Sequence, residues 1–283
     1  MSLIKAVLFG ALQGLTEFLP VSSSGHLAVF HKLFGAAVES MVPMGVIAHL
    51  GTLLAVLIYF RKDLVMFARI LSPKTLSSVV RRPSKLFIAL PPQDDHGRLS
   101  YQRILAMIVV GTLPAAVIGL AFKDTIERVF ASVKVVGAMF LVTAAVLLLT
   151  RLAQQGERTV WHTWLLSAFL IGIAQALAIT PGISRSGFTI AAGIFLGLRR
   201  DFAARFSFLL SIPAIAGAFV LEFGDIARAL STQGALEMVL IFLAAFAIGY
   251  VSIAVLLRIV SRGRLHLFGL YCLAAGVLTL CLV

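Results

Sequence analysis

Charged residues are scarce in this sequence. Asp, Glu, Lys and Arg make up only 13% of its 283 residues, about half the share found in ordinary soluble domains. Hydrophobic residues account for 60%, and the mean hydropathy is +1.03. This composition excludes a soluble globular domain and predicts an all-α polytopic membrane protein.

Acidic residues are the scarcer of the two charged kinds, with 12 Asp and Glu against 24 Lys and Arg. The net charge of +12 would suit a nucleic-acid-binding protein, but the basic residues lie between apolar segments. Positive-inside bias explains them more simply, so we expect no nucleic acid partner.

The sequence has only two cysteines and none of the common cofactor motifs, and we expect no leader peptide. Cys272 and Cys281 lie nine residues apart on one apolar segment, too far apart on a helix to form a disulfide. The first residues contain no basic region and no cleavage site, so we expect them to belong to the mature fold. The absence of a Walker loop, zinc-ligand spacing and a Rossmann fingerprint excludes the functions that depend on them.

The apolar runs form two similar series. Each series begins with two runs too short to span a bilayer, separated by a polar turn, which predicts a re-entrant hairpin. Three longer runs then follow in each series. The predicted hairpins are 3–34 and 164–198, and the predicted spans are 43–59, 104–122, 135–150, 202–221, 236–257 and 265–283.

An odd number of spans per series places the second half upside down relative to the first. The sequence therefore predicts one membrane domain built as an inverted-topology repeat, 1–152 and 153–283, with six transmembrane helices and two re-entrant hairpins. If 61–103, 151–162, 199–205 and 258–264 are cytoplasmic, they hold 17 of the 24 Lys and Arg. This bias predicts that both termini lie outside.

The basic segment 61–103 is predicted to be a cytoplasmic loop with some amphipathic helix, held at the headgroups by its basic residues. A docking site for a partner is the alternative.

The first polar turn joins a carboxylate to hydroxyls and an imidazole. Gln13 and Glu17 are four residues apart and share a helix face that Pro20 ends. A buried carboxylate needs a partner, which favours Glu17 as a metal ligand or general base. A structural Glu bonded to backbone amides of the turn is the alternative.

Three serines, a glycine and a histidine follow. Ser22, Ser23, Ser24 and Gly25 open a second half-helix, whose N-terminus presents free N–H groups; one or two of the serines are expected only to cap it. His26 next to these hydroxyls indicates a nucleophile, base or acid, and a satisfied core histidine is the alternative. His49, in the next span, is a further candidate to line the site.

The second polar turn carries Ser184, Arg185 and Ser186 before another half-helix. An arginine at membrane depth is costly unless it meets an anion, and its planar fork suits phosphate oxygens. An arginine paired only with Glu17 is the structural alternative. Two helix N-termini, an arginine and several hydroxyls within apolar walls predict a site for a phosphorylated lipid.

At these residues the sequence resembles the undecaprenyl-diphosphate phosphatase family of bacterial inner membranes, which is linked to bacitracin resistance. The matching motifs run from Gln13 to His26 and from Pro181 to Thr189. The resemblance implies an enzyme that removes the terminal phosphate of undecaprenyl diphosphate at the outer face with Mg²⁺ or Ca²⁺, and so recycles the lipid carrier for cell-wall synthesis. Many members have Glu where this chain has Gln13.

The resemblance also implies site residues. It implies Glu17, Ser23, His26 and Arg185 as the catalytic core and Glu17 with Gln13 as metal ligands. For substrate binding we expect Ser22, Ser24, Gly25, Ser184, Ser186 and Thr189. The expected partners are the polyprenyl diphosphate and membrane lipids, and the sequence leaves the oligomeric state open, a homodimer included. A transporter or flippase of a phosphorylated lipid is the alternative function.

Overall fold

The protein is all-helical in the part of the chain that is described. The computed structural model describes residues 2–34, 38–71, 96–122, 132–159, 163, 165–230 and 234–282. These residues form eleven helices and no sheet. The helices are α1 (Leu3–Phe18), α2 (Ser23–Phe34), α3 (Val38–Tyr59), α4 (Arg61–Leu71), α7 (His96–Ala121), α9 (Val133–Leu149), α10 (Leu165–Leu177), α11 (Arg185–Phe195), α12 (Arg200–Leu230), α13 (Ala235–Ser261) and α14 (Leu267–Leu282).

Several of these helices are long and apolar enough to cross a bilayer. Such stretches are found in α7, α12 and α13; α3 and α4 would add a fourth only if the pair, bent by 74°, formed one span. α9, α10 and α14 are shorter apolar helices of 13 to 17 residues. The chain is thus a multi-pass membrane protein, as its composition predicts.

Both predicted polar turns coincide with breaks between short helices. α1 ends at Phe18, and Leu19 is extended (φ −62°, ψ 142°) because the residue before a proline avoids the helical region. The break between α10 and α11 contains Gly182 at φ +93°, where a side chain would be strained.

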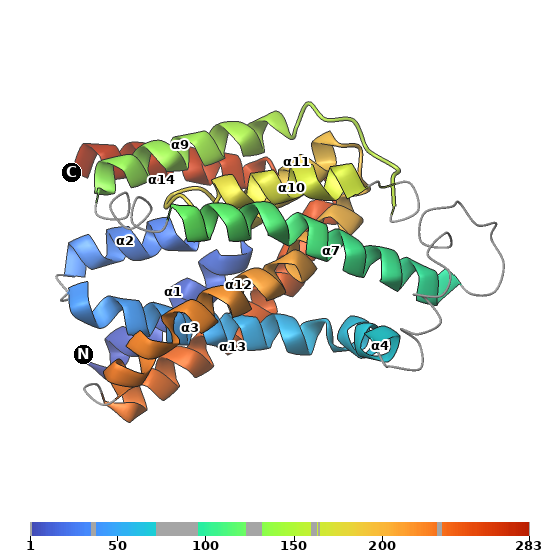
Figure 1. Cartoon of the computed structure of the whole chain (residues 1–283). Helices are drawn as coiled ribbons and strands as arrows, with labels where there is room; N and C mark the ends of the chain where they lie inside the picture. The colour runs from blue at the N-terminus through green and yellow to red at the C-terminus, as the bar shows by residue number, and fades with distance from the viewer. Residues whose placement is uncertain are drawn as a thin grey trace.

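Helices from the two halves of the chain pack against one another. α1 lies along α13, and α10 lies along α7. α9 lies beside α14, and α3 contacts both α12 and α13 (Figure 1). α2 and α11 both pack on α9, which brings the two turns together inside the bundle.

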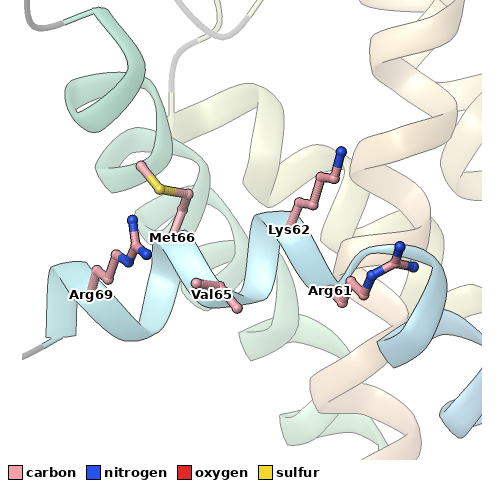
Figure 2. A pocket seen from close by; sticks show the side chains of 5 residues that line it. All are labelled: Arg61, Lys62, Val65, Met66 and Arg69. Carbon is pink, nitrogen blue, oxygen red and sulfur yellow. The ribbon is translucent and has the colours of Figure 1, made fainter.

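The two ends of the bundle differ. Both chain termini lie at one end, and α4 lies at the opposite end (Figure 1). α4 confirms the predicted helix in segment 61–103; residues 72–95 of that segment lie outside the described residues. Figure 2 shows five side chains of α4 that line a pocket.

Candidate active site

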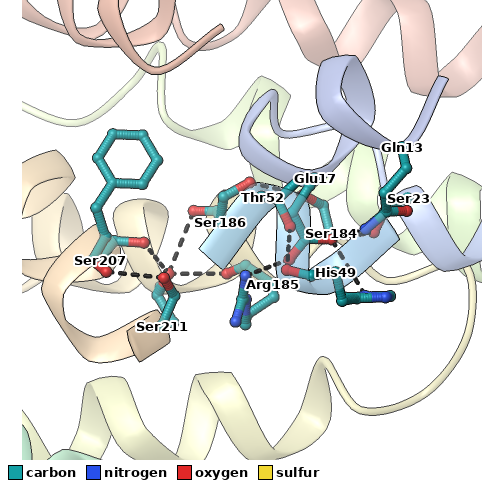
Figure 3. Close-up of polar contacts among 12 residues, drawn as sticks. Gln13, Glu17, Ser23, His49, Thr52, Ser184, Arg185, Ser186, Ser207 and Ser211 are labelled. Carbon is teal, nitrogen blue, oxygen red and sulfur yellow. Dashed lines mark hydrogen bonds and ion pairs between the residues drawn. The ribbon is translucent and has the colours of Figure 1, made fainter. Parts of the chain in front are cut away.

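A single buried carboxylate, Glu17, forms the centre of a polar cluster between the two turns. Its side chain is 5% exposed. Glu17 Oε2 accepts hydrogen bonds from Gln13 Nε2 (2.9 Å) and Ser23 Oγ (2.6 Å), and His49 Nε2 lies 3.5 Å away. Arg185 Nη2 donates to Glu17 Oε1 (Figure 3). Residues from α1, α2, α3 and α11 therefore meet at one carboxylate.

The local sequence explains the first of these contacts. Residues four apart lie on the same face of a helix, so Gln13 can donate to Glu17 within α1. The predicted sharing of a face is confirmed. The predicted structural alternative for Glu17 is not what is seen, because its partners are side chains rather than amides of the turn.

The two half-helices begin in the same way. In each, the Oγ of a capping serine accepts from the backbone N–H three residues later, and a second serine lies 3.3 Å from the first. These sets are Ser22, Ser24 and Gly25 in one turn and Ser184, Ser186 and Gly187 in the other. Ser23 and Arg185 therefore occupy equivalent positions, at the first residue of α2 and of α11, and both reach Glu17.

The two turns differ at the position of Glu17. Five residues before Ser22 stands Glu17, whereas five residues before Ser184 stands Ile179. Nine residues before each serine stands a glutamine, Gln13 or Gln175. The amide of Gln175 is buried and finds no hydrogen-bond partner among the described residues. Only one turn thus supplies a carboxylate.

The second turn is fixed by buried hydroxyls. Thr143 Oγ1 of α9 accepts from Ser184 N (3.1 Å) and donates to Gly182 O (3.0 Å). Thr189 Oγ1 lies 2.6 Å from Ser207 Oγ of α12. Ser186 Oγ donates to Leu19 O (3.3 Å), which ties this turn to the first. These bonds hold the backbone that carries Arg185.

Of the predicted catalytic residues, His26 is the one whose side chain bonds neither to Glu17 nor to the side chains around Glu17 among the described residues. Its Nδ1 lies 2.8 Å from Ser22 O, and its Nε2 lies 2.7 Å from the hydroxyl of Tyr271. The His26 and Tyr271 rings are stacked, with centroids 5.6 Å apart and planes 12° apart. The Phe140 ring is T-shaped to the His26 ring, with centroids 5.1 Å apart, and it packs so tightly on Gly25 that an added Cβ would lie 2.6 Å from Cζ.

His49 takes the place beside Glu17 that the sequence suggested for His26. Its Nδ1 lies 2.7 Å from Gly45 O, one turn earlier in α3, so its Nε2 is directed at Glu17. The side chain is 38% exposed. Sequence reasoning named His49 only as a candidate to line the site, and it missed Tyr271, because nothing in the pattern of α14 marks that tyrosine.

This arrangement has the parts that phosphoryl transfer requires. A serine hydroxyl donates directly to a carboxylate, which is the contact between a nucleophile and its general base. A guanidinium and two helix N-termini supply donors for phosphate oxygens. The apolar helices around the cluster suit a substrate with a hydrocarbon tail.

Comparison with known proteins also indicates an enzyme that acts on a lipid diphosphate. The family described as bacitracin resistance protein BacA matches residues 6–278. A relative from Desulfosudis oleivorans, named undecaprenyl-diphosphatase, is 47% identical over 279 residues, covering 98% of this chain and 97% of the relative. Relatives with the same name from Methanosphaera stadtmanae (39% identity, 100% and 98% coverage) and Myxococcus xanthus (40% identity, 100% and 90% coverage) are also similar over their whole length.

Proposed function

The chain belongs to the family of bacitracin resistance protein BacA, and from this premise we propose that it hydrolyses undecaprenyl diphosphate to undecaprenyl phosphate and inorganic phosphate. The full-length similarity to relatives named undecaprenyl-diphosphatase supports the substrate. The observation that carries the proposal is the 2.6 Å hydrogen bond from Ser23 to Glu17 beside Arg185.

Ser23 is the nucleophile in this proposal. Its Oγ attacks the terminal phosphorus while its proton passes to Glu17 Oε2. The bond between that phosphorus and the bridging oxygen breaks, and undecaprenyl phosphate departs with the bridging oxygen. Water then attacks the phosphoserine, Ser23 Oγ recovers the proton from Glu17, and inorganic phosphate leaves with both water protons.

His26 is the alternative nucleophile, and its contacts support a lesser role. Its Nδ1 lies against the Ser22 carbonyl oxygen, so this nitrogen carries a proton and only Nε2 can act. Nε2 is hydrogen-bonded to Tyr271. We assign Tyr271 as a positioning residue that holds the imidazole at the edge of the site.

Arg185 binds the diphosphate. Its side chain is 20% exposed and reaches Glu17 from the N-terminus of α11. Phosphate oxygens accept bidentate hydrogen bonds from a guanidinium as carboxylates do. The free N–H groups at the starts of α2 and α11 add donors. Ser184 and Thr189 already bond within the protein, so we assign them to holding this helix start rather than to direct phosphate contact.

The described part of the chain alone offers too few ligands for a divalent cation, so the substrate phosphates have to supply the others. Among the described residues, no three His, Cys, Asp or Glu side chains form a metal-binding group. Glu17 and Gln13 supply oxygens, and Gln13 Oε1 is buried with no hydrogen-bond partner in the described part of the chain. Mg²⁺ is often held by one or two carboxylates together with substrate phosphates, where it neutralises developing charge. We propose Glu17 and Gln13 as its ligands from the protein.

We also propose how the helices are related by the repeat and how the chain is oriented in the membrane. The packing of α1 on α13 and of α10 on α7 relates the first helix of each predicted hairpin to the second predicted span of the other half, which supports an inverted repeat of 1–152 and 153–283. α1–α2 and α10–α11 would be the two re-entrant hairpins. The charge bias supports an inner-membrane protein with both termini outside and a site open to the outer face.

Phosphate release by the purified protein tests this function. We expect release from undecaprenyl diphosphate, lost on chelation, and a decrease of about 10²–10³ in kcat/KM for Arg185→Ala. Ser23→Ala should abolish release, and acid quenching of the native enzyme should leave phosphoserine at position 23.

The matched control is Arg199→Ala, which removes an arginine paired with Asp201 outside the site. Thermal unfolding of each variant separates loss of activity from loss of fold. Full activity in Arg185→Ala would contradict the assignment of Arg185 to diphosphate binding. A folded native protein that moves the lipid but releases no phosphate would show that the chain is a carrier instead.

A further inference from the structure

The outward face of α4 carries three basic side chains. Arg61, Lys62 and Arg69 are exposed and, with Val65 and Met66, line a shallow groove of about 390 Å³ (Figure 2). The spacing of these five residues places them on one side of the helix. We call them the basic stripe. None of the three charges pairs with an acid among the described residues.

The opposite face of α4 is anchored in the bundle. Phe67 is buried in the core and meets Tyr101 of α7 edge to face. Asp63 is 7% exposed and accepts from Arg205 of α12 at 3.0 and 3.2 Å and from Tyr101 at 3.1 Å. The acid of this helix is therefore neutralised internally, and the basic stripe keeps its full charge of three.

The position of α4 places this stripe at a membrane surface. A single residue, Phe60, separates the apolar stretch of α3 from α4, which lies at 74° to it. A helix with several charged residues in one turn does not continue through the hydrocarbon core. When such a helix is sharply bent away from a spanning helix, it lies along the membrane interface. Val65 is 50% exposed on the same face, so the stripe combines an apolar contact with positive charge.

We propose that the basic stripe of α4 is a binding site for anionic phospholipid headgroups of the adjacent leaflet, separate from the site at Glu17. Arg61, Lys62 and Arg69 contact headgroup phosphates, and Val65 and Met66 contact the upper acyl chains. Among the described residues, no acid opposes this positive charge, because Asp63 faces inward. The rigid anchor distinguishes α4 from a basic loop, whose charges would be spread over many positions.

Native mass spectrometry of the full chain titrated with phosphatidylglycerol tests this site. Each basic residue at an anionic surface is worth roughly fivefold in affinity, so R61Q/K62Q/R69Q should weaken binding by roughly 100-fold. Phosphatidylcholine should bind the native protein and the variant equally. The substitutions lie on exposed positions, and phosphate release should stay unchanged in detergent.

The matched control is R258Q/R262Q/R264Q, which removes the same charge from exposed arginines at the end of α13. Because these arginines lie outside the groove on α4, phosphatidylglycerol binding at the stripe should stay close to that of the native protein. Equal losses in both triple variants would overturn the proposal, because binding would then follow net charge. Competition by soluble glycerol phosphate as strong as by the lipid would overturn the lipid assignment.

Discussion

Hydrogen bonds to the backbone orient individual side chains in the site. His26 and His49 each place Nδ1 against the carbonyl oxygen four residues earlier, and each directs Nε2 outward from its helix. The partners of Nε2 differ: Tyr271 for His26 and Glu17 for His49. Two histidines with the same backbone arrangement therefore have different surroundings.

Tyr271→Phe tests the positioning of His26. The substitution keeps the stacked ring and removes one hydroxyl, so we expect kcat to fall by about two- to tenfold, the worth of one neutral hydrogen bond. KM and the melting temperature should change little. Steady-state phosphate release as a function of substrate concentration gives both kinetic constants.

Tyr59→Phe is the control, since Tyr59 lies ten residues beyond His49 on α3, about 15 Å along the helix. A lower melting temperature with normal kcat in Tyr271→Phe would contradict the assignment and leave the tyrosine a packing role.

The helix pairs α1–α2 and α10–α11 have the same local features at the break between their helices, with one important difference. Both use a capping serine and a second serine, and both carry a glutamine nine residues earlier. In the first segment the glutamine donates to Glu17; in the second, Ile179 replaces the acid and Gln175 is left without a partner among the described residues.

Gln175→Leu should therefore stabilise the protein. A buried amide without a partner costs about 1–3 kcal/mol, and leucine has a similar size. We expect a higher melting temperature and unchanged phosphate release. Gln13→Leu is the contrasting variant, because it removes a donor to Glu17 and should lower activity. A lower melting temperature in Gln175→Leu would show that the amide is hydrogen-bonded after all.

The sequence was informative where the cause is local. The shared face of Gln13 and Glu17, the helix end before Pro20 and the serine caps all follow from spacing and backbone preference. The sequence predicted that both turns contribute to one site, and the bond between Arg185 and Glu17 agrees with that prediction.

What could not be predicted depends on how distant helices pack. Tyr271 is 245 residues from His26, and its contact arises from α14 lying beside α9. Ser22 adopts a left-handed conformation (φ 67°), which is uncommon for serine and is set by the cap and the turn together. The anchoring of α4 through Asp63 and Arg205 likewise links residues 142 positions apart.

At the scale of the whole molecule, the arrangement of its ends predicts orientation. Both termini lie at the end of the bundle opposite α4 (Figure 1). With Cys281→Ser as background and Cys272 buried, Lys5→Cys should react with an impermeant maleimide in intact spheroplasts. Lys62→Cys should react only after permeabilisation, because positive charge is retained in the cytoplasm.

The reverse pattern of labelling would contradict the orientation. Labelling of both positions from the same side would contradict the number of membrane crossings.

The pairing of Arg185 with Glu17 has a consequence for turnover. A phosphate that binds Arg185 through Nη2 competes with the Glu17 carboxylate already held by that atom. The protein thus carries its own competitor, which lowers affinity for any anion and favours the ligand with the greater charge. A diphosphate competes better than the monophosphate that remains on the lipid, so the carboxylate helps to expel the product and leaves the site ready for the next substrate.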